Sequence, residues 1–94
     1  MSTPVIQARI IVSGVVQGVG YRYFTLSLAR RYPITGWVRN LPDGRVEVVA
    51  EGEQGLINDF ISDLRIGPSS GNVAGVEVEW KAYTGDFENF SLKF

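Results

Sequence analysis

The sequence predicts an α+β sandwich, a fold in which two helices cover one face of an antiparallel sheet. The prediction rests on two kinds of apolar periodicity. Three segments alternate apolar and polar residues, as strands with one buried face do, and two segments carry apolar residues at helical spacing. Their order is β-α-β-β-α-β, and a short extra strand is expected at the end of the chain. At 94 residues, we expect a single domain over residues 1–94.

The first half of the chain predicts a strand, a glycine-rich loop, a helix and a second strand. Residues 6–12 alternate with a period of two, and three glycines at positions 14–20 indicate the loop that follows. Residues 21–32 place aromatic and aliphatic side chains on one helical face, which Pro33 ends. Residues 35–41 then predict a short strand.

The second half begins with a turn and predicts a hairpin, a helix and two further strands. Leu-Pro-Asp-Gly at residues 41–44 is typical of a tight turn, because proline presets φ and glycine tolerates positive φ. Residues 46–51 alternate again and form the hairpin. Residues 56–64 carry an apolar helical face, which the Gly67-Pro68 pair ends. The remaining segments are a polar loop and two strands, at residues 69–75, 76–83 and 90–94. The complete order is that of the ferredoxin-like sandwich.

Composition excludes several kinds of chemistry. The chain has no cysteine and no histidine, so disulfides, thiolate or imidazole metal sites and histidine-based catalysis are ruled out. A net charge of −1 and a pI near 5.3 argue against a nucleic-acid partner. The sequence shows neither a signal peptide nor an apolar run of membrane length, so we expect no membrane partner and a cytoplasmic location.

The near-neutral total hides a charge asymmetry. Residues 1–45 contain six arginines and one aspartate, a balance of +5, whereas residues 46–94 contain three basic and nine acidic residues, a balance of −6. The first half could therefore bind an anion. Alternatively, the two halves simply attract each other.

One motif carries the parts of a phosphate site. Residues 13–22 read SGVVQGVGYR and lie between the first predicted strand and the first helix. Glycines allow successive backbone N–H groups to converge on one anion, and the N-terminus of the helix adds further donors. Arg22 would supply a planar fork for two phosphate oxygens. The segment matches neither the dinucleotide fingerprint nor the P-loop. On composition alone, it could also be a glycine-rich connector between the strand and the helix, with a surface arginine.

Other polar and aromatic residues allow two interpretations each. The Asn40 amide could hold a water molecule or cap the turn that follows it. Glu77 with Glu79, and Asp59 with Asp63, could bind a metal or transfer protons, but their alternation with apolar residues favours exposure to solvent. Core packing is favoured over base stacking for the aromatic residues on apolar stripes, which are Tyr21, Phe24, Trp37, Trp80, Phe90 and Phe94.

Two stretches, GVVQGVGYR at residues 14–22 and GWVRNLPDGRVEVVAEG at residues 36–52, resemble the acylphosphatase family. The similarity extends over residues 8–94, and the family has the ferredoxin-like fold. The resemblance implies hydrolysis of small acyl phosphates to carboxylate and phosphate by in-line attack of water, with Arg22 and Asn40 as catalytic residues. The backbone amides implied to bind the phosphate are those of Gln17, Gly18, Val19, Gly20 and Tyr21.

The sequence departs from the family pattern at two positions. Val15 stands where many members carry arginine or lysine, and Tyr21 replaces the more common phenylalanine. The resemblance implies no metal and no cofactor, and we expect a monomer. The alternative is a non-catalytic module of the same fold that binds an anion such as carbamoyl phosphate. The motifs would bind the phosphate end of a substrate, and they do not indicate which acyl group the substrate carries.

Overall fold

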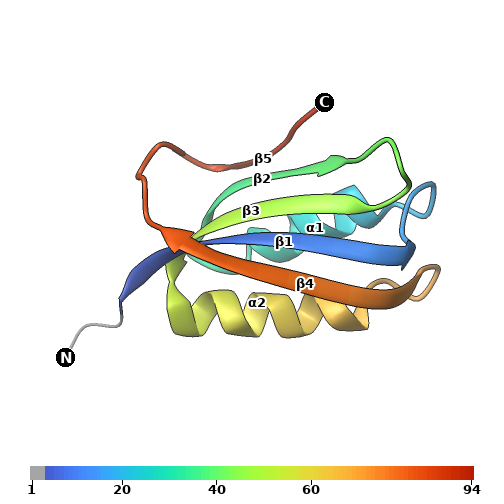
Figure 1. The fold of residues 1–94 in the computed structure, drawn as a ribbon, viewed down its shortest axis with the longest axis horizontal. Helices are drawn as coiled ribbons and strands as arrows, with labels where there is room; N and C mark the ends of the chain where they lie inside the picture. The colour runs from blue at the N-terminus through green and yellow to red at the C-terminus, as the bar shows by residue number, and fades with distance from the viewer. Residues whose placement is uncertain (1–3) are drawn as a thin grey trace.

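The computed structural model describes residues 4–94 and confirms the ferredoxin-like α+β sandwich (Figure 1). Its strands form one sheet in the order β4-β1-β3-β2-β5, and both helices lie against the same face of it. The elements are β1 (Val5–Val15), α1 (Tyr21–Ala29), β2 (Thr35–Asn40), β3 (Val46–Glu53), α2 (Gln54–Ile66), β4 (Asn72–Ala82) and β5 (Phe90–Leu92).

The sheet is mixed, whereas the sequence predicted an antiparallel one. Strands β1, β2, β3 and β4 pair antiparallel, but β5 pairs parallel with β2, with Gly36 opposite Phe90. The chain leaves β4, crosses the end of the sheet and returns along the far edge in the direction of β2 (Figure 1). Glu51 holds this connection, since its carboxylate accepts hydrogen bonds from Thr84 and the Gly85 N–H.

Strand β4 begins at Asn72, so the prediction of a polar loop over 69–75 is wrong for residues 72–75. Gly75 pairs with Ser13, and after a register shift between Ser13 and Gly14, Val73 and Asn72 pair with Gly14 and Val15. Gly14 has φ of 121°, and a Cβ there would lie 2.2 Å from the carbonyl oxygen of Asn72. Only glycine permits this close approach, and the shift hides the strand periodicity.

The helix ends differ from the prediction by a few residues. Helix α1 stops at Ala29, and residues 30–32 continue as turns in which the Arg31 N–H donates to the Leu28 carbonyl at 3.0 Å. Helix α2 is longer than predicted and ends, as expected, before Gly67, whose φ is 68°. Among residues 4–94, no helix combines the length and the apolar character that spanning a membrane requires.

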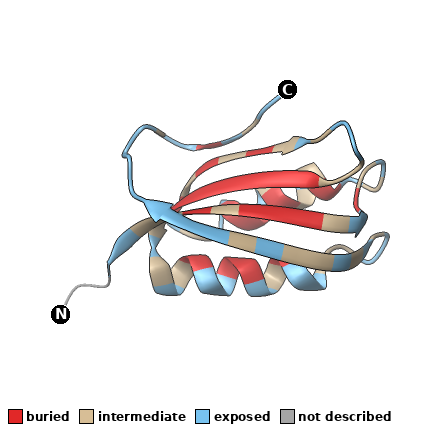
Figure 2. Cartoon of the chain, viewed as in Figure 1, coloured by how far each residue is buried: buried red, intermediate tan, exposed pale blue. Residues whose placement is uncertain are grey.

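The core lies between the sheet and the two helices (Figure 2). It includes Tyr21 and Phe90, in agreement with the prediction for these aromatic residues. The same prediction is wrong for Trp80, which is 38% exposed near the end of β4, and for Phe94, which is 95% exposed. Trp37 lies on the opposite face of the sheet from the helices, where Lys93 contacts its ring.

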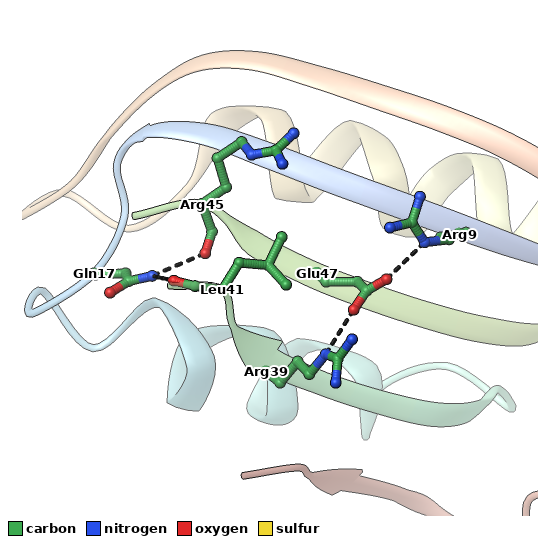
Figure 3. A network of polar contacts seen from close by, with 6 residues as sticks. All are labelled: Arg9, Gln17, Arg39, Leu41, Arg45 and Glu47. Carbon is green, nitrogen blue, oxygen red and sulfur yellow. Dashed lines mark hydrogen bonds and ion pairs between the residues drawn. The ribbon is translucent and has the colours of Figure 1, made fainter. Parts of the chain in front are cut away.

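The central strand β3 is buried on both faces. Glu47, on the face without helices, is only 3% exposed and bridges two neighbouring strands (Figure 3). It accepts hydrogen bonds of 2.6 Å from Arg9 on β1 and from Arg39 on β2. Burial alone would raise the pKa of Glu47, but the two arginines outweigh that effect and lower it. These ion pairs fix β2, which carries Asn40, against the middle of the sheet.

Candidate active site

The loop between β1 and α1 has the backbone geometry of an anion-binding nest. Gly18 and Gly20 have φ angles of 75° and 78°, and every non-glycine residue among residues 4–94 has a negative φ. The sign of φ therefore alternates from Gln17 to Tyr21. This alternation turns successive N–H groups toward the same side of the chain, where they can converge on one anion. The glycines at these two positions are the residues that permit it.

The N-terminus of α1 adds unpaired donors to the same place. The first hydrogen bond of the helix runs from the Phe24 N–H to the Gly20 carbonyl, at 2.9 Å. The N–H groups of residues 21–23 therefore have no partner within the helix. The first turn contains no acidic residue to neutralise the positive end of the helix dipole. An anion bound here would meet both the dipole and the free amides.

These elements enclose a small pocket of about 140 Å³. Arg22, in the first turn of α1, is partly buried beside it, and Asn40 reaches it from the end of β2. Asn40 lies opposite Val46 and alternates with the buried Val38, so its side chain is on the helix-bearing face of the sheet. The pocket is lined by Val16, Gly18, Gly20, Tyr21, Arg22, Tyr23 and Asn40.

The pocket thus brings together most of the residues that the sequence singled out. Arg22 and Asn40 lie in it with three members of the predicted phosphate loop, Gly18, Gly20 and Tyr21. The other two, Gln17 and Val19, belong to the same turn but do not line it. Sequence reasoning missed the lining residues Val16 and Tyr23.

Phe94 is a further contact that the sequence did not reveal. The guanidinium carbon of Arg22 lies 5.4 Å from the centre of the Phe94 ring. The ring lies within cation–π distance of the guanidinium but is itself 95% exposed, so this is a contact at the protein surface. No local sequence signal could have indicated this contact, because Phe94 lies beyond the last strand.

The buried Tyr21 joins the start of α1 to the end of α2. Its hydroxyl donates a hydrogen bond of 2.8 Å to the carbonyl of Leu64. Its own carbonyl accepts one of 2.9 Å from the Thr25 hydroxyl. Burial raises the pKa of Tyr21 above its usual range, so the phenol stays neutral. This residue therefore anchors the phosphate loop to the second helix.

The side chain of Gln17 crosses from the loop to the β2–β3 turn (Figure 3). Its Nε2 donates to the carbonyl oxygens of Leu41 and Arg45, at 2.7 and 2.9 Å. The Leu41 N–H donates in turn to the Arg45 carbonyl at 2.8 Å. The phosphate loop and the turn after Asn40 are therefore joined by a side chain.

The paired carboxylates lie away from this pocket. Glu77, Glu79 and Asp59 are exposed, as predicted. Asp63 is partly buried and accepts a hydrogen bond of 2.6 Å from the Tyr32 hydroxyl. Within residues 4–94, no three carboxylates cluster closely enough to hold a metal ion.

The fold and the pocket define an α+β sandwich in which the loop before the first helix has the backbone geometry of an anion-binding nest. The acylphosphatase family model matches residues 8–92, and the chain belongs to that family. It is 46% identical over 89 residues to an acylphosphatase of Anaeromyxobacter dehalogenans, an alignment that covers 95% of this chain and 96% of the relative.

Solved structures agree with this assignment. The crystal structure of acylphosphatase from Bacillus subtilis superposes with a TM-score of 0.91 at 37% identity, covering 95% of this chain and 99% of that one. A HypF protein from T. kodakarensis superposes with a TM-score of 0.82 at 32% identity, but this chain covers only 12% of it. The same fold therefore also occurs as a small part of a much longer chain.

Proposed function

We propose that this acylphosphatase cleaves the carboxyl–phosphate bond of small acyl phosphates by in-line attack of a water molecule. A mixed anhydride already has a good leaving group, so the site must neutralise the phosphoryl oxygens and orient the water. Arg22 and the amides of residues 17–21 perform the first task. Asn40 performs the second, because an amide side chain can both donate to and accept from a water molecule.

The observation that carries this proposal is the shared pocket. Arg22, the free N-terminal amides of α1 and Asn40 border the same hollow of about 140 Å³. The positive groups come from the loop and helix, whereas Asn40 comes from the end of a strand. The loop and helix would hold the phosphoryl group, and a water molecule bound to Asn40 would attack it from a different direction.

The reaction needs no protein base in this scheme. The attacking water can pass its proton to a phosphoryl oxygen of the substrate, and the products are a carboxylate and inorganic phosphate. The guanidinium and the amides supply the positive field that a metal ion supplies in other phosphoryl-transfer sites, so we propose a reaction without metal or cofactor.

We propose that the enzyme acts as a cytoplasmic monomer that binds no nucleic acid. Three of the six arginines in the first half are already paired, Arg9 and Arg39 with Glu47 and Arg45 with Asp43. Glu47, from the second half, neutralises part of the +5 charge of residues 1–45 and so weakens the attraction for a polyanion. In analytical ultracentrifugation, a single species of 10.4 kDa would support the monomer, and a species of twice that mass would contradict it.

Hydrolysis of benzoyl phosphate in the presence of EDTA tests the proposed chemistry. We expect the wild-type protein to hydrolyse this substrate. In Asn40→Ala, kcat/KM should fall by at least ~10³-fold, which corresponds to about 4 kcal/mol of transition-state stabilisation. Near-wild-type turnover by Asn40→Ala would refute the assigned role. A wild-type protein that binds phosphate but has no turnover would instead favour the binding module.

A further inference from the structure

The Gln17 side chain uses both of its donors on the β2–β3 turn. The carbonyls of Leu41 and Arg45 accept these bonds at 2.7 and 2.9 Å, and Gln17 is partly buried. Here a single amide joins the two segments of the pocket that are remote in sequence.

Asn40 is immobilised by both of its neighbours. On one side, Arg39 donates to Glu47 at 2.6 Å, which ties β2 to β3. On the other side, the Leu41 N–H donates to the Arg45 carbonyl, and Gln17 bonds to the carbonyls of both residues. The backbone at Asn40 is therefore fixed relative to the sheet by its own hairpin, and relative to the phosphate loop by Gln17.

We infer that Gln17 is a positioning residue that sets the location of Asn40 relative to the phosphate loop. This inference rests on the proposed function, in which the loop holds the phosphoryl group and Asn40 holds the water. In-line attack requires the two to be aligned, and a misplacement of about 1 Å can reduce the rate by ~10²-fold. In this proposal the backbone amide of Gln17 helps to bind the phosphate, and its side chain positions the segment that carries Asn40.

A double-mutant cycle with Gln17→Ala and Asn40→Ala tests this inference. In the wild-type background, Gln17→Ala should lower kcat for benzoyl phosphate by about tenfold to a hundredfold. In the Asn40→Ala background, it should lower kcat by less than about threefold, because nothing is left to position. The inhibition constant of inorganic phosphate should change by less than about threefold, since the loop amides and Arg22 stay in place.

Two further variants distinguish the positioning of Asn40 from a general increase in the mobility of the loop. Ser70→Ala removes a different side-chain bond to this loop, from the Ser70 hydroxyl to the Val19 carbonyl at 3.1 Å, and should leave kcat within about twofold. Gln17→Glu keeps the shape but replaces the donors with an acceptor that faces two carbonyls. It should lose at least as much kcat as Gln17→Ala, and it gives a second test if that variant does not fold.

The outcomes distinguish the inference from the function on which it rests. An equal loss of kcat in both backgrounds, an unchanged kcat, or a loss matched by weaker phosphate inhibition would overturn the role of Gln17. An Asn40→Ala protein with wild-type turnover would overturn the proposed function itself, whatever Gln17→Ala does.

Discussion

The hydroxyl of Tyr21 should stabilise the fold without taking part in the chemistry. Tyr21 is 1% exposed, and its hydroxyl donates to the Leu64 carbonyl at 2.8 Å. Leu64 lies in the last turn of α2, where carbonyl groups lack a partner within the helix. Tyr21→Phe removes this bond while the ring, and the backbone amide of the phosphate loop, stay in place.

The expected cost follows from the burial of both groups. A net hydrogen bond contributes about 1 kcal/mol, and leaving a buried carbonyl without a donor costs a further 1 kcal/mol or so. We therefore expect Tyr21→Phe to lower the free energy of unfolding by about 2 kcal/mol. For a domain of this size, the melting temperature should fall by roughly 8–16 °C.

Urea denaturation measures this effect directly. The midpoint should fall by about 1–2 M with an unchanged slope. Tyr32→Phe is a matched control, because the Tyr32 hydroxyl also donates to α2, at 2.6 Å to Asp63, but from a position partly open to solvent. Its loss should lower the free energy of unfolding by less than Tyr21→Phe does.

Activity provides the second half of the test. At 25 °C, where both proteins are folded, kcat/KM of Tyr21→Phe should lie within about threefold of the wild-type value. A stability change below about 0.5 kcal/mol would refute the anchoring role. A hundredfold loss of activity in the folded variant would show that the hydroxyl acts in the chemistry.

Three further predictions concern charge. Arg22→Lys should lower kcat/KM for benzoyl phosphate by at least ~10²-fold, because an ammonium does not reproduce a two-pronged fork, and activity close to wild type would contradict that geometry. Inorganic phosphate should inhibit competitively, and at about 100 times its Kd it should stabilise the fold by ~2.7 kcal/mol, so a melting temperature unmoved by phosphate would argue against the loop site. The pKa of Glu47 is lowered in the folded protein, so its ionised form stabilises the fold above the unfolded pKa of about 4.3, and this contribution is lost as the pH falls through the folded pKa. Glu47→Gln should therefore be less stable at neutral pH and should lose less stability on acidification, as urea titrations between about pH 7 and pH 3 would show.

Local patterns account for what the sequence predicted well. Period-two alternation in β1, β3 and most of β4, and the helical faces of α1 and α2, depend on residues close together in the chain. The backbone conformation of the loop between β1 and α1 was also predictable, because positive φ at Gly18 and Gly20 favours glycine. The pocket around Arg22 and Asn40 followed from the resemblance of two motifs rather than from periodicity.

The features that escaped prediction depend on contacts between distant segments. The register shift beside Gly14 conceals the start of β4, and the direction of β5 depends on how the preceding connection is held by Glu51. Burial of Glu47 requires arginines from two other strands. The contacts of Gln17 with the β2–β3 turn and of Phe94 with Arg22 join segments that are far apart in the sequence.

The central claim is that Arg22 holds the phosphate whereas Asn40 orients the water. Calorimetric titration of wild type, Arg22→Ala and Asn40→Ala with inorganic phosphate, alongside kcat for benzoyl phosphate, tests it most directly. We predict that Arg22→Ala loses both phosphate binding and turnover, while Asn40→Ala binds phosphate within about threefold of wild type and loses at least ~10³-fold in kcat. Loss of phosphate binding in Asn40→Ala, or retained turnover in either variant, would contradict this division of roles.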